Sequence, residues 1–139
     1  MLISMLKNLV NTDEQFAFPS TGEHKMLDLI SEDSRYKFIV DVNRKGYINI
    51  SKRAYQARYR KDIVLLRLDV CGPPHANPDG VVLSGNHLHV YKEGYEDKIA
   101  IDIPDEIVNP DDMYQTLIDF LVYFKTLNIN KLKIQVTIE

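Results

Sequence analysis

One short stretch of the chain holds most of the side chains that can carry out proton-transfer, anion-binding or metal chemistry. Between Leu65 and Tyr95 lie three of the chain's four histidines. Imidazoles exchange protons near neutral pH, guanidinium groups bind anionic oxygens, and a carboxylate can orient a neighbouring imidazole. We take as candidate catalytic residues Arg67, Asp69, His75, His87, His89 and Tyr91.

The first chemistry that fits this set is metal-independent cleavage of RNA. His87 and His89 would act as general acid and base, because an imidazole titrates near the working pH. Asp69 would orient and charge-stabilise one of them. Positive donors would stabilise the phosphorane, since charge develops on its oxygens. The candidate donors are Arg58, Arg60 and Arg67, with Tyr91 or Tyr95 as a hydrogen-bond donor.

The second chemistry is metal binding by the run H-x-H-x3-E, which begins at His87. His87 and His89 could ligate a divalent metal together with Glu93 or Asp69. The run resembles the first half of the cupin signature. After His89 the chain contains no further histidine, so His75 would have to supply a third imidazole. Our primary interpretation includes no cofactor, and this site is its alternative.

A basic segment precedes the histidines and extends the prediction to an RNA partner. Seven Lys or Arg residues and no acidic residue lie between Val42 and Lys61, although the net charge of the chain is -3. A local positive field attracts nucleic acid, and interleaved tyrosines offer stacking surfaces. A solvated strand face with ordinary tyrosine packing explains the same run. The candidate substrate-binding residues are Arg58, Tyr59, Arg60, Lys61 and Tyr95.

Alternation along two predicted strands brings the candidates together. In "DIVLLRLDV", Arg67 and Asp69 share a face with Leu65, while the apolar residues Val64, Leu66, Leu68 and Val70 share the other. In "HLHVY", His87, His89 and Tyr91 share a face. If these strands pair across the intervening loop, the polar residues meet on one sheet face. The loop "GPPHANPDG" contains stiff turns that would hold His75 beside that face.

The elements that position this face indicate an α+β fold with a mostly antiparallel, curved sheet in meander order. Strands are predicted in "HKMLDLI", "YKFIVDVN", "YINIS", "KIAIDI" and "KLKIQVTIE", and "EGYED" is predicted to be a hairpin turn. A helix over Pro110–Leu127, capped by Asn109, is expected to pack on the sheet. Its apolar face comprises Leu117, Phe120, Leu121 and Phe124. A short N-terminal helix is predicted over Ser4–Val10.

Size and composition limit the class of protein. A chain of 139 residues with 45% hydrophobic residues is expected to form a single domain, 1–139. One cysteine, Cys71, excludes an internal disulfide. No apolar run reaches the roughly 18 residues of a membrane span, so we expect a cytoplasmic protein with no membrane contact. His24 is interpreted as a surface residue.

The central motifs also resemble a known group of proteins. The run "RYRKDIVLLRLDVCGPPHANPDG...HLHVYKEGYEDKIAIDIP" and the upstream "FIVDVNRKG" resemble an uncharacterised family of small bacterial and prophage proteins. Its pattern is R-x-D, G-P-P-H-x-N-P-D-G and H-x-H-x-Y-x-E-G-Y. More distantly, Arg67, Asp69, His75, His87 and His89 are similar to the motif of TumE-type toxins of toxin-antitoxin systems. That resemblance implies a small ribonuclease-like toxin neutralised by a cognate antitoxin.

A third interpretation requires no catalysis. A protein of this size from a mobile element can bind and block a host or phage protein, or serve as an antitoxin-like partner. The acidic segment from Asp102 to Asp112 and an exposed strand edge would then form the interface. The sequence is also compatible with a homodimer.

Overall fold

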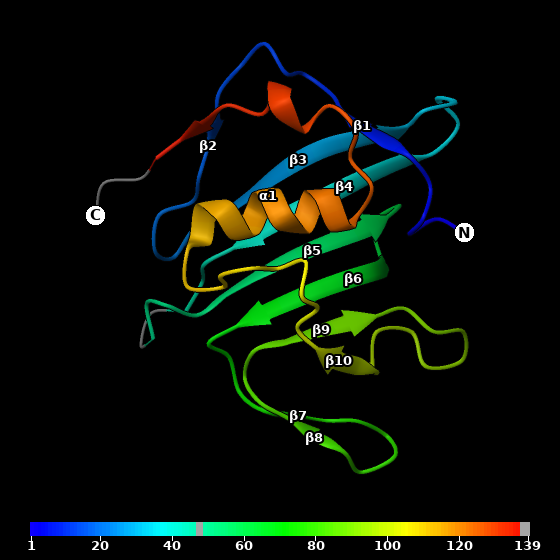
Figure 1. Cartoon of the computed structure of the whole chain (residues 1–139), viewed down its shortest axis with the longest axis vertical. Coiled ribbons are helices and arrows are strands. Elements are labelled where there is room, and N and C mark those ends of the chain that lie inside the picture. The colour runs from blue at the N-terminus through cyan, green and yellow to red at the C-terminus, as the bar shows by residue number, and fades with distance from the viewer. Residues whose placement is uncertain (47–48, 137–139) are drawn as a thin grey trace.

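The computed structural model describes residues 1–46 and 49–136, and its main feature is one open antiparallel sheet. The sheet has seven strands in the order β1-β3-β4-β5-β6-β9-β10 (Figure 1). The strands are β1 (Lys7–Leu9), β3 (His24–Ser31), β4 (Lys37–Asn43), β5 (Arg53–Tyr59), β6 (Ile63–Val70), β9 (His87–Val90) and β10 (Ala100–Asp102). From β3 to β10 the order follows the chain, which confirms the predicted meander.

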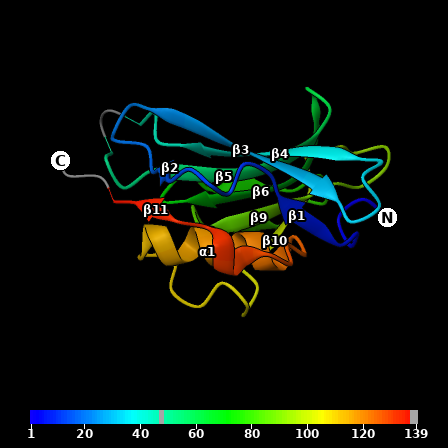
Figure 2. The same cartoon turned by 90° about the horizontal axis from the view of Figure 1, so that it is seen from above.

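The remaining elements are short and lie around this sheet. Strand β11 (Ile134–Gln135) pairs in parallel with β2 (Phe16–Ala17), and β7 (His75–Ala76) pairs with β8 (Val82–Leu83). A single turn of 3-10 helix, η1, spans Ile129–Lys131. The helix α1 (Met113–Tyr123) covers one side of the sheet, as Figure 2 shows from above. The α+β class and the C-terminal helix are therefore as predicted.

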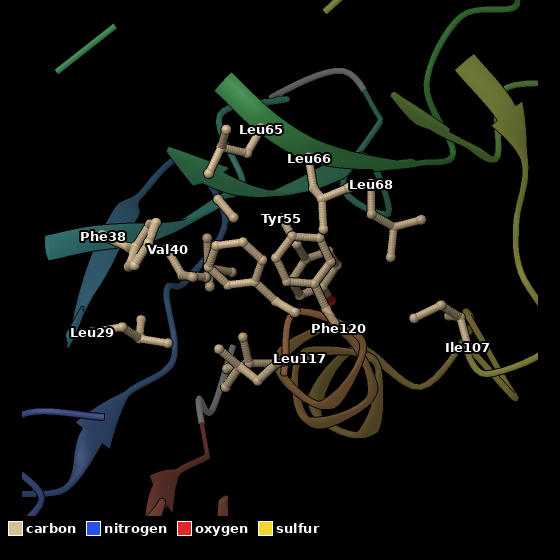
Figure 3. Close-up of a cluster of buried hydrophobic side chains, with 14 of the residues drawn as sticks. Leu29, Phe38, Val40, Tyr55, Leu65, Leu66, Leu68, Ile107, Leu117 and Phe120 are labelled. Carbon is tan, nitrogen blue, oxygen red and sulfur yellow. The ribbon is translucent and has the colours of Figure 1, made fainter. Parts of the chain in front are cut away.

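The hydrophobic core lies between α1 and the sheet. The predicted apolar face of the helix is confirmed, because Leu117, Phe120, Leu121 and Phe124 are fully buried. Figure 3 shows Leu117 and Phe120 of this face directed toward side chains of the central strands, among them Tyr55 and Leu66. The sheet contributes Leu29, Phe38, Val40, Tyr55, Leu66 and Leu68. Since alternate residues of a strand point to opposite faces, this packing leaves the other residues of β3 to β9 on a second face, which we call the outer face.

The first predicted element is wrong: residues 4–10 form no helix. A turn is followed by β1, which pairs antiparallel with β3 from Lys7↔Ser31 to Leu9↔Leu29. Lys7 and Leu9 are buried and Asn8 between them is less so, which is the period of a strand. A short apolar run fits the period of a helix and the period of a strand equally well. Here the segment forms a strand because it pairs with the edge of β3, which would otherwise be unpaired.

The C-terminal helix is shorter than predicted at both ends. Its N-cap is Asp112, whose Oδ1 accepts hydrogen bonds from the backbone N–H groups of Tyr114 and Gln115 at 3.1 and 3.0 Å. Asn109 instead accepts from Asp112 N through its backbone oxygen and so forms a turn before the helix. The helix ends at Tyr123, and Lys125 adopts a left-handed φ of 65°.

Three strands differ from the prediction. Strand β5 was not predicted, because Arg53 to Tyr59 carries few of the residues typical of strands. The predicted strand "YINIS" includes Tyr47 and Ile48, which lie outside the described residues, and Ile50 and Ser51 form a turn. Of "KLKIQVTIE" only β11 is a strand, and residues 137–139 lie outside the described range. No helix in the described ranges, 1–46 and 49–136, is long and apolar enough to cross a bilayer.

Candidate metal centre and basic groove

The strand that carries Arg67 and Asp69 pairs with the strand that carries the two histidines, as predicted. Strands β6 and β9 are antiparallel neighbours, with Arg67 opposite His89 and Asp69 opposite His87. These four residues lie on the outer face, because their neighbours Leu66, Leu68 and Leu88 point into the core. The i, i+2 spacing within R-x-D and H-x-H thus brings four polar side chains together.

One neighbour on this face was placed wrongly. Leu65 was expected beside Arg67, but it is buried in the core with 3% of its surface exposed. The pairing of β5 and β6 shifts between Ala57↔Leu66 and Arg58↔Val64, which leaves Leu65 without a partner. The shift is a β-bulge, and the extra residue turns a side chain from one face to the other.

The side chains of Asp69, His87 and His89 converge on one point. His87 Nε2 lies 3.0 Å from His89 Nε2 and 3.1 Å from Asp69 Oδ2, and His89 Nε2 lies 3.3 Å from the same oxygen. Only 1% of His87 and 2% of His89 is exposed, whereas the side chain of Asp69 is 19% exposed. These three residues form a group that could hold a metal ion.

The second ring nitrogen of each histidine, Nδ1, is hydrogen-bonded to a backbone carbonyl. His87 Nδ1 donates to Ser84 O at 2.6 Å, and His89 Nδ1 donates to Asp97 O at 2.7 Å. A carbonyl only accepts hydrogen bonds, so each Nδ1 carries a proton. The two Nε2 atoms and the carboxylate oxygen are then three electron-rich atoms at contact distance. A cation beside these atoms, whether a proton, a guanidinium group or a metal ion, offsets the repulsion among their lone pairs.

Arg67 closes the cluster on the side of the solvent. Its Nε donates to Asp69 Oδ1 at 3.0 Å, its Nη2 donates to His89 Nε2 at 2.9 Å, and its Nη1 contacts Asp97 Oδ2 at 3.4 Å. Burial alone would raise the pKa of Asp69, but the contacts with His89 and Arg67 outweigh it and lower that pKa. The carboxylate is therefore kept ionised between its cationic and imidazole neighbours.

His75 reaches the cluster from the hairpin of β7 and β8. Its ring centroid lies 4.6 Å from that of His89 and 5.5 Å from that of His87, and its Nε2 contacts Lys98 O at 2.8 Å. Asn77 fixes the hairpin, because its side chain exchanges two hydrogen bonds of 2.8 Å with the backbone of Ala100. Sequence reasoning singled out His75 and missed the anchoring function of Asn77.

The other candidates lie away from this cluster. Tyr91 packs against the hydrophobic core, and the hairpin turn predicted around Glu93 and Tyr95 is confirmed by hydrogen bonds from Tyr95 N to Lys92 O and from Lys98 N to Tyr95 O. Tyr95 is 42% exposed and its ring is contacted by Lys92. Glu93 is exposed in the same turn and does not belong to the group formed by the two buried histidines.

The basic segment divides into structural and exposed residues. Arg44 donates to Pro19 O at 3.0 Å, and Arg53 bonds Tyr55 Oη at 3.0 Å and the backbone oxygen of Pro110. Both arginines are buried. Tyr55 is fully buried, and burial raises its pKa to about 12. The exposed basic residues of the segment are Lys45, Lys52, Arg60 and Lys61.

Arg58 belongs to a second polar cluster, centred on Asp41. Arg58 Nε donates to Asp41 Oδ2 at 2.8 Å, His24 Nε2 lies 2.8 Å from Asp41 Oδ1, and Gln56 donates to the same carboxylate at 3.2 Å. His24 is exposed, in agreement with its interpretation as a surface residue, but its ring also has a carboxylate partner. Its partner comes from the adjacent strand, 17 residues away.

Two adjoining hollows on the outer face connect the clusters. One, of about 430 Å³, is lined by His24, Asp41, Gln56, Arg58, Lys61 and Arg67 among others. The next, of about 320 Å³, is lined by residues that include Lys52, Asp69, Gly72 and Pro73. Both share Asn43, Lys45, Ala54 and Arg67. We call the two hollows together the basic groove.

Comparison with known proteins places the chain in a family and assigns no activity. The sequence matches DUF6978, a family of unknown function, over residues 1–126. No curated protein and no solved structure matches it. The chain belongs to the DUF6978 family, in agreement with the expected uncharacterised family.

Proposed function

We propose that this DUF6978 protein binds a divalent transition-metal ion through Asp69, His87 and His89, and that the centre hydrolyses a bond in an anionic substrate. The observation that supports this best is the separation of 3.0 to 3.3 Å among the three donor atoms. Bonds of about 2.1 Å to a tetrahedral ion place its ligands about 3.4 Å apart. The donor atoms already have nearly that spacing.

The surroundings of the ligands also suit a metal. Metal-binding histidines almost always donate their second ring N–H to a carbonyl or carboxylate, as His87 and His89 do to Ser84 O and Asp97 O. Two imidazoles favour zinc or iron over magnesium or calcium. Three protein ligands leave a coordination position for water, which is typical of catalytic rather than structural zinc.

Arg67 would bind the substrate. Metal binding would replace its hydrogen bond to His89 Nε2, because that lone pair can serve only one partner. Arg67 would keep its Nε contact with Asp69 Oδ1, so the guanidinium would stay beside the centre with a free donor. The metal would supply a hydroxide near neutral pH, and Arg67 would stabilise negative charge on the substrate.

Metal binding is tested directly by titration. The protein is dialysed against EDTA, freed of chelator, and titrated calorimetrically with Zn²⁺ and separately with Mg²⁺. We expect one equivalent of Zn²⁺, at least about 100-fold weaker binding in the His87→Ala, His89→Ala double variant, and weak Mg²⁺ binding in both proteins. His24→Ala is the control, because His24 is on the same face but outside the cluster. Equal Zn²⁺ binding by the wild type and the double variant would refute the proposal.

A metal-free ribonuclease toxin is the second candidate. The Arg67 and Asp69 pair beside imidazoles and a basic groove favours it. A phosphate does not fit between the Nε2 atoms of His87 and His89 at 3.0 Å, so His75 would have to act as acid or base. Cleavage of total RNA that persists in EDTA and is lost in His75→Ala would favour this candidate. An inhibitor that acts by binding a protein would keep its effect in every histidine variant.

A further inference from the structure

We propose that the basic groove binds the phosphodiester backbone of a single-stranded nucleic acid and leads it to Arg67 and Asp69. The inference rests on the proposed function, since it names the class of anion that would reach the metal centre. It is supported by the position of the groove, by the charges that line it and by the absence of described Phe, Tyr or Trp side chains from its lining.

The groove crosses the sheet and ends at the cluster. Cross-strand partners within its lining run from His24 through Asn43 and Ala54 to Asp69. These residues belong to four adjacent strands, and neighbouring strands lie about 4.8 Å apart. The path from β3 to β6 is therefore about 14 Å long. A path of that length accommodates a short stretch of an extended nucleic acid strand.

The accessible charge along this path is positive. Lys45, Lys52 and Lys61 are exposed, and the side chain of Arg67 is 31% exposed. The carboxylate of Asp41 is only 6% exposed and is covered by Arg58 and His24. Arg58 has its donors occupied by Asp41, Lys61 O and Met26, so it neutralises Asp41 rather than contacting a ligand. A chain with a net charge of -3 thus presents a local cationic path.

The lining determines which part of a nucleic acid is recognised. Tyr55 is buried in the core, and Tyr59 packs against Tyr36 and Phe38 at ring distances of 5.9 and 5.7 Å. Neither tyrosine lines the groove, so neither offers a stacking surface to bases within it. Lysines and an arginine without aromatic partners bind phosphates, so we infer binding that does not depend on base sequence.

The test is fluorescence anisotropy with labelled 12-nucleotide RNA and DNA single strands, performed in EDTA so that it is independent of the metal. We expect both to bind at low salt, and the Lys52→Gln, Lys61→Gln double variant to bind at least about 10-fold more weakly. Each phosphate contact contributes about 0.7 to the slope of log K against log salt concentration, so the double variant should reduce that slope by about 1.4. Lys131→Gln, Lys133→Gln is the control, because these exposed lysines lie outside the groove.

The outcomes separate the two proposals. Nucleic acid binding by the His87→Ala, His89→Ala variant would support the groove even if the metal proposal fails. No binding at low salt, or equal weakening in both lysine variants, would overturn the groove while leaving the metal titration unaffected. An acidic peptide that binds as tightly as RNA, with the same dependence on Lys52 and Lys61, would also overturn it. Weaker binding of RNA than of DNA, or the reverse, would identify the natural source of the phosphodiester chain.

Discussion

Asp41 organises one end of the outer face, and its carboxylate has three side-chain partners. Asp41 is buried, with 5% of its surface exposed. Its carboxylate accepts hydrogen bonds from Arg58 and Gln56 and also contacts His24. Removing one partner of a buried ion pair is costly, because the remaining charge loses its counter-ion. The energetic role of Asp41 can therefore be measured separately from any function.

We expect Asp41→Asn to lower the free energy of unfolding by about 2–3 kcal/mol, since the amide cannot neutralise Arg58. The measurement is urea denaturation followed by circular dichroism. Asp28→Asn is the matched control on the neighbouring strand, because Asp28 is exposed, and it should change the free energy by less than about 0.5 kcal/mol. Equal losses in the two variants would contradict this view of Asp41.

At the same scale, the sequence predicted the cluster but not its geometry. Arg67, Asp69, His87 and His89 could be assigned to one face because both motifs have i, i+2 spacing. Their exact register could not be predicted, because it depends on how the residues between β6 and β9 close. The contact of His24 with Asp41 was missed, since the two residues belong to different strands and no local pattern links them.

At the scale of elements, Lys7 joins the first strand to the helix. Its Nζ donates to the backbone oxygens of Ile3, Met5 and Phe124 at 2.9, 2.7 and 2.9 Å. The ammonium also lies 3.7 Å from the ring centroid of Phe124, at the C-terminal end of α1. A cation at that end of a helix is favourable, and here it also satisfies otherwise unpaired carbonyls.

Lys7→Met should lower the free energy of unfolding by about 3 kcal/mol, because buried carbonyl oxygens would lose their donor. Burial, followed by the charge of Lys125, lowers the pKa of Lys7 to about 8 from 10.5. Between these values the unfolded state binds more protons, so the wild type should gain stability relative to Lys7→Met as pH rises from 8 to 10. Denaturant titrations at several pH values test this, with Lys37→Met as an exposed control.

A difference between wild type and Lys7→Met that stays constant across that pH range would show that the pKa of Lys7 is the same in both states. The titration of Tyr55 does not affect the comparison, because its side chain is unchanged in both proteins.

The elements themselves were predicted unevenly, for physical reasons. Alternation identified β3, β4, β6 and β9, in which one face is buried and the other is polar. Strand β5 was not predicted because its inward side includes Arg53 beside Tyr55 and Ala57, so the alternation of apolar residues is interrupted. The first strand was taken for a helix because its inward lysine is satisfied by contacts far away in the chain.

At the scale of the whole molecule, metal binding should appear as global stabilisation. A ligand that binds only the folded state and is present at 100 times its dissociation constant adds about 2.7 kcal/mol to the free energy of unfolding. One kcal/mol shifts the melting temperature of a chain of this size by about 2–4 °C. We therefore expect Zn²⁺ at that concentration to raise the melting temperature by about 5–10 °C, as measured by differential scanning calorimetry. The His87→Ala, His89→Ala variant should show no such shift, and an equal shift in both would indicate adventitious binding.

The segment that joins β6 to β9 is closed at its base by two glycines. Gly72 N donates to Gly85 O at 3.1 Å, and a Cβ on Gly85 would lie 2.0 Å from Gly72 O. On the strand side of the glycines, Asn86 Oδ1 accepts a hydrogen bond from Cys71 N at 2.7 Å. The strands are therefore aligned before the hairpin begins. The exposed tip of the segment, from Pro78 to Gly80, takes no part in this closure, in the side-chain contacts of His75 and Asn77 or in the hydrogen bond to Ser84 O, so it can vary in length and sequence during evolution without displacing Asp69 or His87. Within a lineage, new specificities could arise at that tip while the chemistry beneath it is inherited unchanged.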